Sequence, residues 1–160
     1  MRGYLKMRYN NKGLTLVEVL IAMGIMGIVM TSIFSFFIPN LKTFNRTDNH
    51  IQAQNNAQTA MNRIVDDIIG GQGVARTTNP VIFKINDTKF IKYEHVDETL
   101  KRGEGTSQME ITIEEDPFAN NITEFRVEQT EANGVIITIT SKINDSVVPL
   151  TNEIYFRNGN

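Results

Sequence analysis

Residues 14–38 read LTLVEVLIAMGIMGIVMTSIFSFFI, and this apolar stretch decides how the chain is organised. It holds 25 residues, and Glu18 is its single charged side chain. At about 1.5 Å per residue, a helix of this length extends over roughly 37 Å, enough to cross a bilayer with some tilt. A helix that is apolar on every side is typical of a membrane span. The stretch therefore predicts a membrane helix, and Pro39 behind it predicts a kink or the exit from the membrane.

The residues before Leu14 predict the orientation of this helix. They include four basic side chains and no acidic one: Arg2, Lys6, Arg8 and Lys12. Basic residues beside a membrane helix favour the cytoplasmic side. We therefore expect a single-pass protein with a cytoplasmic N-terminus and residues 40–160 outside.

The most specific motif lies where the basic segment meets the apolar stretch. A secretory signal has a shorter apolar core followed by a small-residue cut site, whereas residues 12–22 here read KGLTLVEVLIA. The ten residues 13–22 resemble the class III signal of type IV prepilins and type II secretion pseudopilins. The resemblance implies that prepilin peptidase cuts between Gly13 and Leu14, that Leu14 becomes the N-methylated terminus, and that the apolar helix is retained. Met7 is an alternative start that would still leave a complete leader.

Glu18 is the acidic residue five places after the implied cut. A charged carboxylate costs roughly 2.5–3.5 kcal/mol deep in hydrocarbon and less near the interface, so a partner is expected. The resemblance implies that this partner is the methylated amino terminus, Leu14, of a neighbouring subunit, and that the pair sets the register of packed helices. The simpler alternative is that Glu18 points to the headgroups. Gly24 and Gly27 either permit close helix contact or are ordinary membrane-helix glycines.

Residues 40–69 contain neither proline nor glycine, so the pattern favours continuation of the helix beyond the membrane. The middle of this segment, residues 47–59, is rich in Asn and Gln. From Met61 to Ile68 the apolar residues follow helical spacing, and the Gly70–Gly71 pair predicts the helix end. We expect this second half of the helix to pack on a sheet.

After Gly73 the pattern changes to alternating β-branched and aromatic residues, which predicts strands. The expected strands cover residues 81–85, 89–93, 108–113, 125–129 and 135–140, with a last strand at 153–156. The expected turns are Asn79–Pro80, Asn86–Asp87, Glu104–Gly105, Asp116–Pro117, Asn133–Gly134 and Asn144–Asp145, of which Asn133–Gly134 suits a tight hairpin.

These elements predict an α+β fold, in which a long N-terminal helix packs on a mostly antiparallel sheet. The layout resembles the pilin fold over the whole chain. The expected division is a leader at 1–13, a transmembrane and filament-core helix at 14–39, the soluble half of that helix at 40–71, and an extracytoplasmic β-rich head at 72–160.

Little in the rest of the sequence suggests catalysis. The chain has no cysteine, which excludes disulfides, thiolate metal sites and cysteine nucleophiles. His50 and His95 lack a second ligand at metal-binding spacing, and no nucleophile elbow or phosphate loop is found. We therefore expect no catalytic residue, no cofactor and no metal. Two acidic groups, at 94–98 and 114–116, favour a solvated acidic edge over a calcium site.

Charge also bears on partners. The residues after Gly13 carry 12 basic and 18 acidic side chains, a net charge of −6, which does not favour nucleic-acid binding.

Asp66 and Asp67 oppose the helix dipole at its C-terminal end, so one of them is expected to pair with Arg63 or Arg76.

Short further similarities narrow the family resemblance. The chain is similar to minor pilins of the PilW or PulJ (GspJ-like) group, with a competence minor pilin of the ComGF type as the neighbouring possibility. The matching stretches are residues 61–68, 91–93, 100–102, 121–125 and 153–158.

The resemblance implies a structural protein and not an enzyme. Its implied partners are prepilin peptidase, other pilins and minor pilins, and an inner-membrane assembly platform. The chain would be a single-pass membrane protein before assembly and part of a pilus or pseudopilus at the cell surface afterwards. The alternative is a surface-exposed adhesin or DNA-uptake module that presents residues 74–160 on the same anchor.

Overall fold

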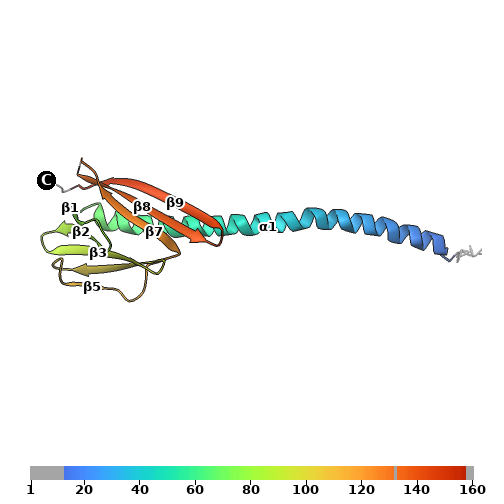
Figure 1. The fold of residues 1–160 in the computed structure, drawn as a ribbon, viewed down its shortest axis with the longest axis horizontal. Helices are drawn as coiled ribbons and strands as arrows, with labels where there is room; N and C mark the ends of the chain where they lie inside the picture. The colour runs from blue at the N-terminus through green and yellow to red at the C-terminus, as the bar shows by residue number, and fades with distance from the viewer. Residues whose placement is uncertain (1–12, 132, 158–160) are drawn as a thin grey trace, which may run out of the picture. The chain divides into compact units, whose positions relative to one another are not determined.

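The computed structural model describes residues 13–131 and 133–157. The chain divides into two compact units, residues 1–43 and 44–160. Helix α1 (Leu16–Ile68) begins in the first unit and ends in the second. The second unit also holds the nine strands found in the described residues (Figure 1).

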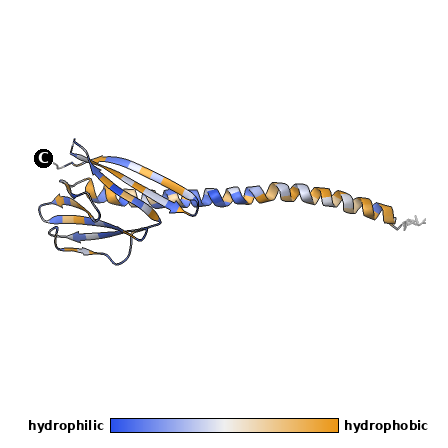
Figure 2. Cartoon of the chain, in the orientation of Figure 1, coloured by the Kyte–Doolittle hydropathy of each residue, from blue (hydrophilic) through white to orange (hydrophobic). Residues whose placement is uncertain are grey.

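The N-terminal part of α1 is apolar on all sides, and its large side chains from Leu16 to Ile38 are exposed. Figure 2 shows this part in orange and the middle of the helix in blue. The helix continues through Pro39, although proline removes one backbone hydrogen bond from a helix. Two neighbouring side chains donate to nearby carbonyls, Asn40 Nδ2 to Phe36 O at 2.7 Å and Thr43 Oγ1 to Pro39 O at 3.0 Å.

The strands form two antiparallel sheets, where the sequence predicted one. The first sheet has the order β1-β2-β3-β4-β5, with β6 also paired to β4, and the second has the order β7-β8-β9. Their bounds are β1 (Gly73–Arg76), β2 (Val81–Asn86), β3 (Lys89–Val96), β4 (Thr99–Gly105), β5 (Ile111–Ile113), β6 (Ala119–Asn120), β7 (Ile122–Gln129), β8 (Gly134–Ile143) and β9 (Ser146–Tyr155).

The predicted turn at Glu104–Gly105 is wrong, because both residues lie in β4. That strand contains two glycines, Gly103 and Gly105, and the sequence pattern assigned Gly105 to a turn. They are needed for a different reason: a Cβ on Gly103 would lie 2.6 Å from the carbonyl oxygen of Thr112 on the adjacent strand β5. Glycine in a strand permits such a close backbone approach.

The other differences concern strands that were not predicted and strand ends that differ from the expected ones. Strands β1, β4 and β6 were not predicted, β5 is shorter than the expected 108–113, and β9 begins at Ser146 and not at 153. Strand β9 contains Pro149, which argues against a central strand, but β9 lies at the edge of its sheet, where proline is tolerated. The expected hairpin between β7 and β8 is confirmed, but Gly134 lies in β8 and not in a two-residue turn; Asn133, just before it, has a φ of 56°.

The core lies where one face of α1 meets the sheets. Ala53, Ala57 and Ala60 are fully buried at helical spacing, and their small size allows close packing. Tyr93 lies at the centre of an aromatic group, with ring centroids 5.9 Å from Phe83 and 5.8 Å from Phe118. The remaining large core residues include Ile64, Ile68, Ile91, Leu100, Ile122, Ile137 and Ile139.

A charged cluster joins the end of α1 to the first sheet. Arg102, which is only 8% exposed, donates from Nε to Asp67 Oδ2 at 2.7 Å. It also donates to Glu104 at 3.0 Å and to Glu114 at 3.2 Å, while the Tyr93 hydroxyl donates to Asp67 at 2.6 Å. We call these five residues the Arg102 cluster.

The expected ion pair at the end of α1 is confirmed for Asp67 with Arg63, but not with Arg76. Arg63 lies 3.8 Å from Asp67, whereas Arg76 bonds to Thr78 and to the Asn79 carbonyl instead. The principal partner of Asp67 is Arg102, which is 35 residues away in sequence and was not predicted.

The Arg102 cluster makes the stability of the fold depend on pH. Burial acts to raise the pKa of Asp67, but hydrogen bonds from Arg102 and Tyr93, together with the charges of Arg102 and Arg63, outweigh it and lower the pKa. The pKa of Glu104 is also lowered, by its hydrogen bonds with Lys89 and Arg102. A lowered folded-state pKa means that the unfolded chain takes up protons first, so these carboxylates stabilise the fold above about pH 4.

We expect the free energy of unfolding to fall as the pH drops below about 4, through the lowered pKa of Asp67. Urea titrations of the detergent-solubilised chain at a series of pH values, followed by near-UV circular dichroism of tyrosine, measure this. Asp67→Asn removes one titrating group, so the variant should be less stable at neutral pH and lose less stability on acidification. An equal acid dependence in both proteins would contradict the role of Asp67.

Candidate functional site

The start of α1 is built as a capping box. The helix begins at Leu16, which makes Thr15 its N-cap and Glu18 its third residue. The Thr15 amide donates to Glu18 Oε2 at 2.9 Å, and the Glu18 amide donates to Thr15 Oγ1 at 3.3 Å. The Thr15 hydroxyl also donates to Glu18 Oε2 at 2.8 Å. This reciprocal pattern satisfies two backbone donors that a helix start otherwise leaves unpaired.

The same arrangement holds a negative charge at the positive end of the helix dipole, where it is favourable. The Thr15 amide and the Thr15 hydroxyl both donate to the same oxygen, Glu18 Oε2, so the Glu18 carboxylate is drawn toward the chain start. It therefore lies close to the position where a cut after Gly13 would create a new amino group.

Gly13 and Leu14 precede the helix and have no regular secondary structure. Leu14 is 81% exposed, and nothing lies within 4 Å of the position that a Cβ on Gly13 would occupy. The peptide bond between them is thus neither helical nor covered by other described parts of the chain. A protease that binds extended backbone can approach such a bond closely.

The sequence identified Gly13, Leu14 and Glu18 as the site, and the three lie within six consecutive residues at the start of α1. In the described residues Glu18 bonds to Thr15, and its expected partner is the terminus of a different subunit. Thr15 was missed, although Thr-x-x-Glu ahead of an apolar helix is the sequence signature of a capping box. The predicted leader at 1–13 lies outside the described residues except for Gly13.

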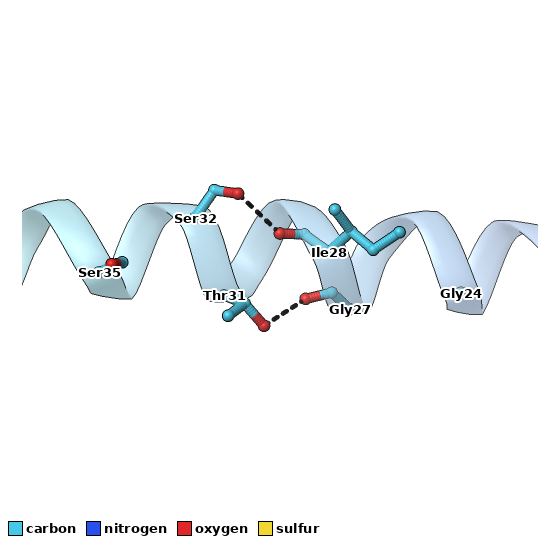
Figure 3. Close-up of a pocket in the computed structure, with 6 residues that line it drawn as sticks. All are labelled: Gly24, Gly27, Ile28, Thr31, Ser32 and Ser35. Atoms are coloured by element: carbon cyan, nitrogen blue, oxygen red, sulfur yellow. Dashed lines mark hydrogen bonds between the residues drawn. The ribbon is translucent and has the colours of Figure 1, made fainter.

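One face of the apolar helix carries small residues. We call it the small-residue face; it lines a shallow hollow, and Figure 3 shows the residues that line it. Thr31 Oγ1 donates to Gly27 O at 2.8 Å and Ser32 Oγ donates to Ile28 O at 2.9 Å, so both hydroxyls are satisfied within the helix. Such a face suits close helix contact in an apolar environment. Its residues are Gly24, Gly27, Ile28, Thr31, Ser32 and Ser35.

The other candidate residues have local structural contacts. His50 is exposed on α1, while His95 contacts the Ile122 carbonyl oxygen through Nε2 at 2.7 Å. Asp97 and Glu98 form the turn between β3 and β4, with φ values of 50° and 59°. Within residues 13–131 and 133–157, no three His, Cys, Asp or Glu residues are grouped so that they would hold a metal ion.

By length and composition, α1 contains a segment that is able to cross a membrane, and this segment is not buried by other described residues. A family model described as the prokaryotic N-terminal methylation motif matches residues 8–34. No curated protein and no solved structure matches the chain.

The match to residues 8–34 includes the whole of the motif that the sequence analysis identified. Together with the apolar helix, it supports a type IV pilin-like protein that is processed by prepilin peptidase and anchored in a membrane. It points to a structural subunit and not to an enzyme.

Proposed function

We propose that this chain is a minor pilin, a low-copy subunit of a type IV pilus or pseudopilus, related to the PilW or PulJ group. Prepilin peptidase cuts between Gly13 and Leu14, and Leu14 is then N-methylated. The helix at 14–39 first anchors the chain in the membrane and then joins the filament core. The head at 72–160 is carried outside the cytoplasm on the soluble half of the helix, residues 40–71.

The observation that carries this proposal is the methylation motif at residues 8–34. In addition, the carboxylate of Glu18 is held beside the chain start by Thr15. A charge in a low-dielectric core needs a partner, and the new amino terminus of a neighbouring Leu14 supplies one of opposite sign. Pairing of the two would align neighbouring helices along the filament axis.

Two surfaces of α1 suit contacts with neighbouring subunits. The small-residue face lets another helix approach closely within the membrane or the filament core. Further along, Phe44 is 71% exposed and Ile51 is 50% exposed, and the two lie seven residues apart on one side of the helix. Both side chains are therefore available for contact with a neighbouring subunit.

The minor role is tested by stoichiometry. Filaments sheared from the surface of cells that express an epitope-tagged chain should contain it at no more than about one-tenth of the major subunit, by quantitative mass spectrometry. Cells without prepilin peptidase serve as the control and should contain none in this fraction. A chain that equals the major subunit in amount, or one that stays in the membrane when filaments form, would contradict the minor-pilin role.

A further inference from the structure

The Asn- and Gln-rich middle of α1 forms one wall of a polar groove in the second unit. Gln52, Asn56 and Thr59 line it at a spacing of four and three residues, so they share one side of the helix. Each stands one residue before a buried alanine of the core stripe, Ala53, Ala57 and Ala60. The helix therefore buries its alanines against the sheets and turns the adjacent row of amide and hydroxyl groups into the groove.

The opposite wall comes from the place where the two sheets separate. Asn121 has a φ of 60°, and this left-handed residue turns the chain from β6 of the first sheet into β7 of the second. Its carbonyl oxygen accepts a hydrogen bond from the Lys142 amide at 2.9 Å, which holds the junction against β8. Asn120 and Asn121 face the groove from this junction.

The polar groups on the two walls do not bond to each other. Gln52 donates to Asp48 on its own helix at 2.8 Å. The side chains of Asn56, Thr59 and Asn120 make no hydrogen bond with any described residue. Facing amides that remain apart present both donors and acceptors to whatever lies between them.

The chemistry of the lining selects the type of ligand. Neither wall contributes a charged side chain, so the groove favours a neutral molecule rich in hydrogen-bonding groups. Phe118 and Ile143 add apolar surface to the same lining. A volume of about 340 Å³ lies at the lower end of the range for small-molecule sites. Sugar rings combine these properties, because their hydroxyls suit amides and their C–H faces and acetamido methyl groups suit apolar surface.

We propose that this groove binds a neutral saccharide of the N-acetylhexosamine type. The proposal goes beyond the role in a filament and does not depend on it. At about 100° per residue, the groove side of α1 is roughly a quarter turn away from the exposed side of Phe44 and Ile51. A subunit contact through Phe44 and Ile51 therefore leaves the groove accessible.

The test uses the full mature chain in detergent, with N,N′-diacetylchitobiose as the probe. Saturation-transfer NMR should detect bound sugar, and titration calorimetry should give its dissociation constant. Asn56→Ala and Asn120→Ala each remove a hydrogen-bonding group from one wall and should weaken binding about tenfold. Asn55→Ala is the matched control, since Asn55 is an exposed amide on the same helix outside the groove, and it should bind as the wild type does.

Near-UV circular dichroism of each variant checks that the fold is retained, which is expected because Asn56 and Asn120 lie outside the core cluster. Absence of saturation transfer to the sugar would overturn the proposal, as would binding that both groove variants leave unchanged. An uncharged alanine–serine tetrapeptide is titrated in parallel. Binding of the peptide in place of the sugar, with sensitivity to the same two variants, would also overturn it.

Discussion

Arg102→Ala is expected to lower the free energy of unfolding by about 3 kcal/mol, because it leaves the partly buried carboxylate of Asp67 without its principal cation. Arg102 is 8% exposed and bonds to Asp67, Glu104 and Glu114, so one substitution removes a hydrogen-bonding cation from three acids. Among these contacts the bond to Asp67 links α1 to β4, and its loss should loosen the helix end from the sheet. Urea unfolding of the detergent-solubilised chain, followed by near-UV circular dichroism, measures the effect.

Arg126 is the matched control. It is also an arginine on a strand between two glutamates, at 2.9 Å from Glu124 and 3.8 Å from Glu128, but its side chain is 63% exposed. Exposed ion pairs contribute up to about 1 kcal/mol, so Arg126→Ala should have a small effect. Equal losses in the two variants would show that the Arg102 cluster has no special role in stability.

Glu18→Ala is expected to reduce incorporation of the chain into filaments at least about tenfold while the leader is still removed. The peptidase acts at Gly13 and Leu14, ahead of Glu18, whereas assembly places the Glu18 charge among packed helices. The variant loses both the charge and the hydrogen bond to the Thr15 amide, and their contributions need to be separated. Immunoblots of membrane and sheared filament fractions measure processing and incorporation in the same cells.

Glu18→Gln separates the two contributions. Glutamine at this position preserves a capping box but carries no charge. If Glu18 pairs with the amino terminus of a neighbour, the glutamine variant should fail as the alanine variant does. Full incorporation of Glu18→Gln would instead assign Glu18 to helix capping alone.

The sequence predicted α1 and the strands that alternate strongly, because those signals are local. Each signal consists of residues that are near one another in the sequence: the apolar stretch at 14–38, the Met61–Ile68 stripe and the Gly70–Gly71 pair. The strands that were missed depend on contacts with other strands of their sheet, which are not adjacent in the local sequence pattern. Strand β4 is a strand because β5 approaches its glycines, and β9 tolerates Pro149 because it lies at an edge.

Of the candidate site, the residues came from the family resemblance and the contacts came from the structure. Nothing in the local pattern around Asp67 indicated Arg102, since the pair is formed only when β4 packs against α1. The groove could not be predicted from the sequence either. Its two walls are about 60 residues apart along the chain, and the sequence showed only an amide-rich helix segment. The capping box, in contrast, was readable from Thr15 and Glu18 alone.

The most direct test of the pilin-like processing is the chemical structure of the mature amino terminus. Mass spectrometry of the chain purified from cells that contain prepilin peptidase should find Leu14 as the first residue, with one methyl group on its amino nitrogen. Cells without the peptidase should retain the leader. An intact Met1 or Met7 terminus in peptidase-positive cells, or a cut after Ala22, would contradict the account.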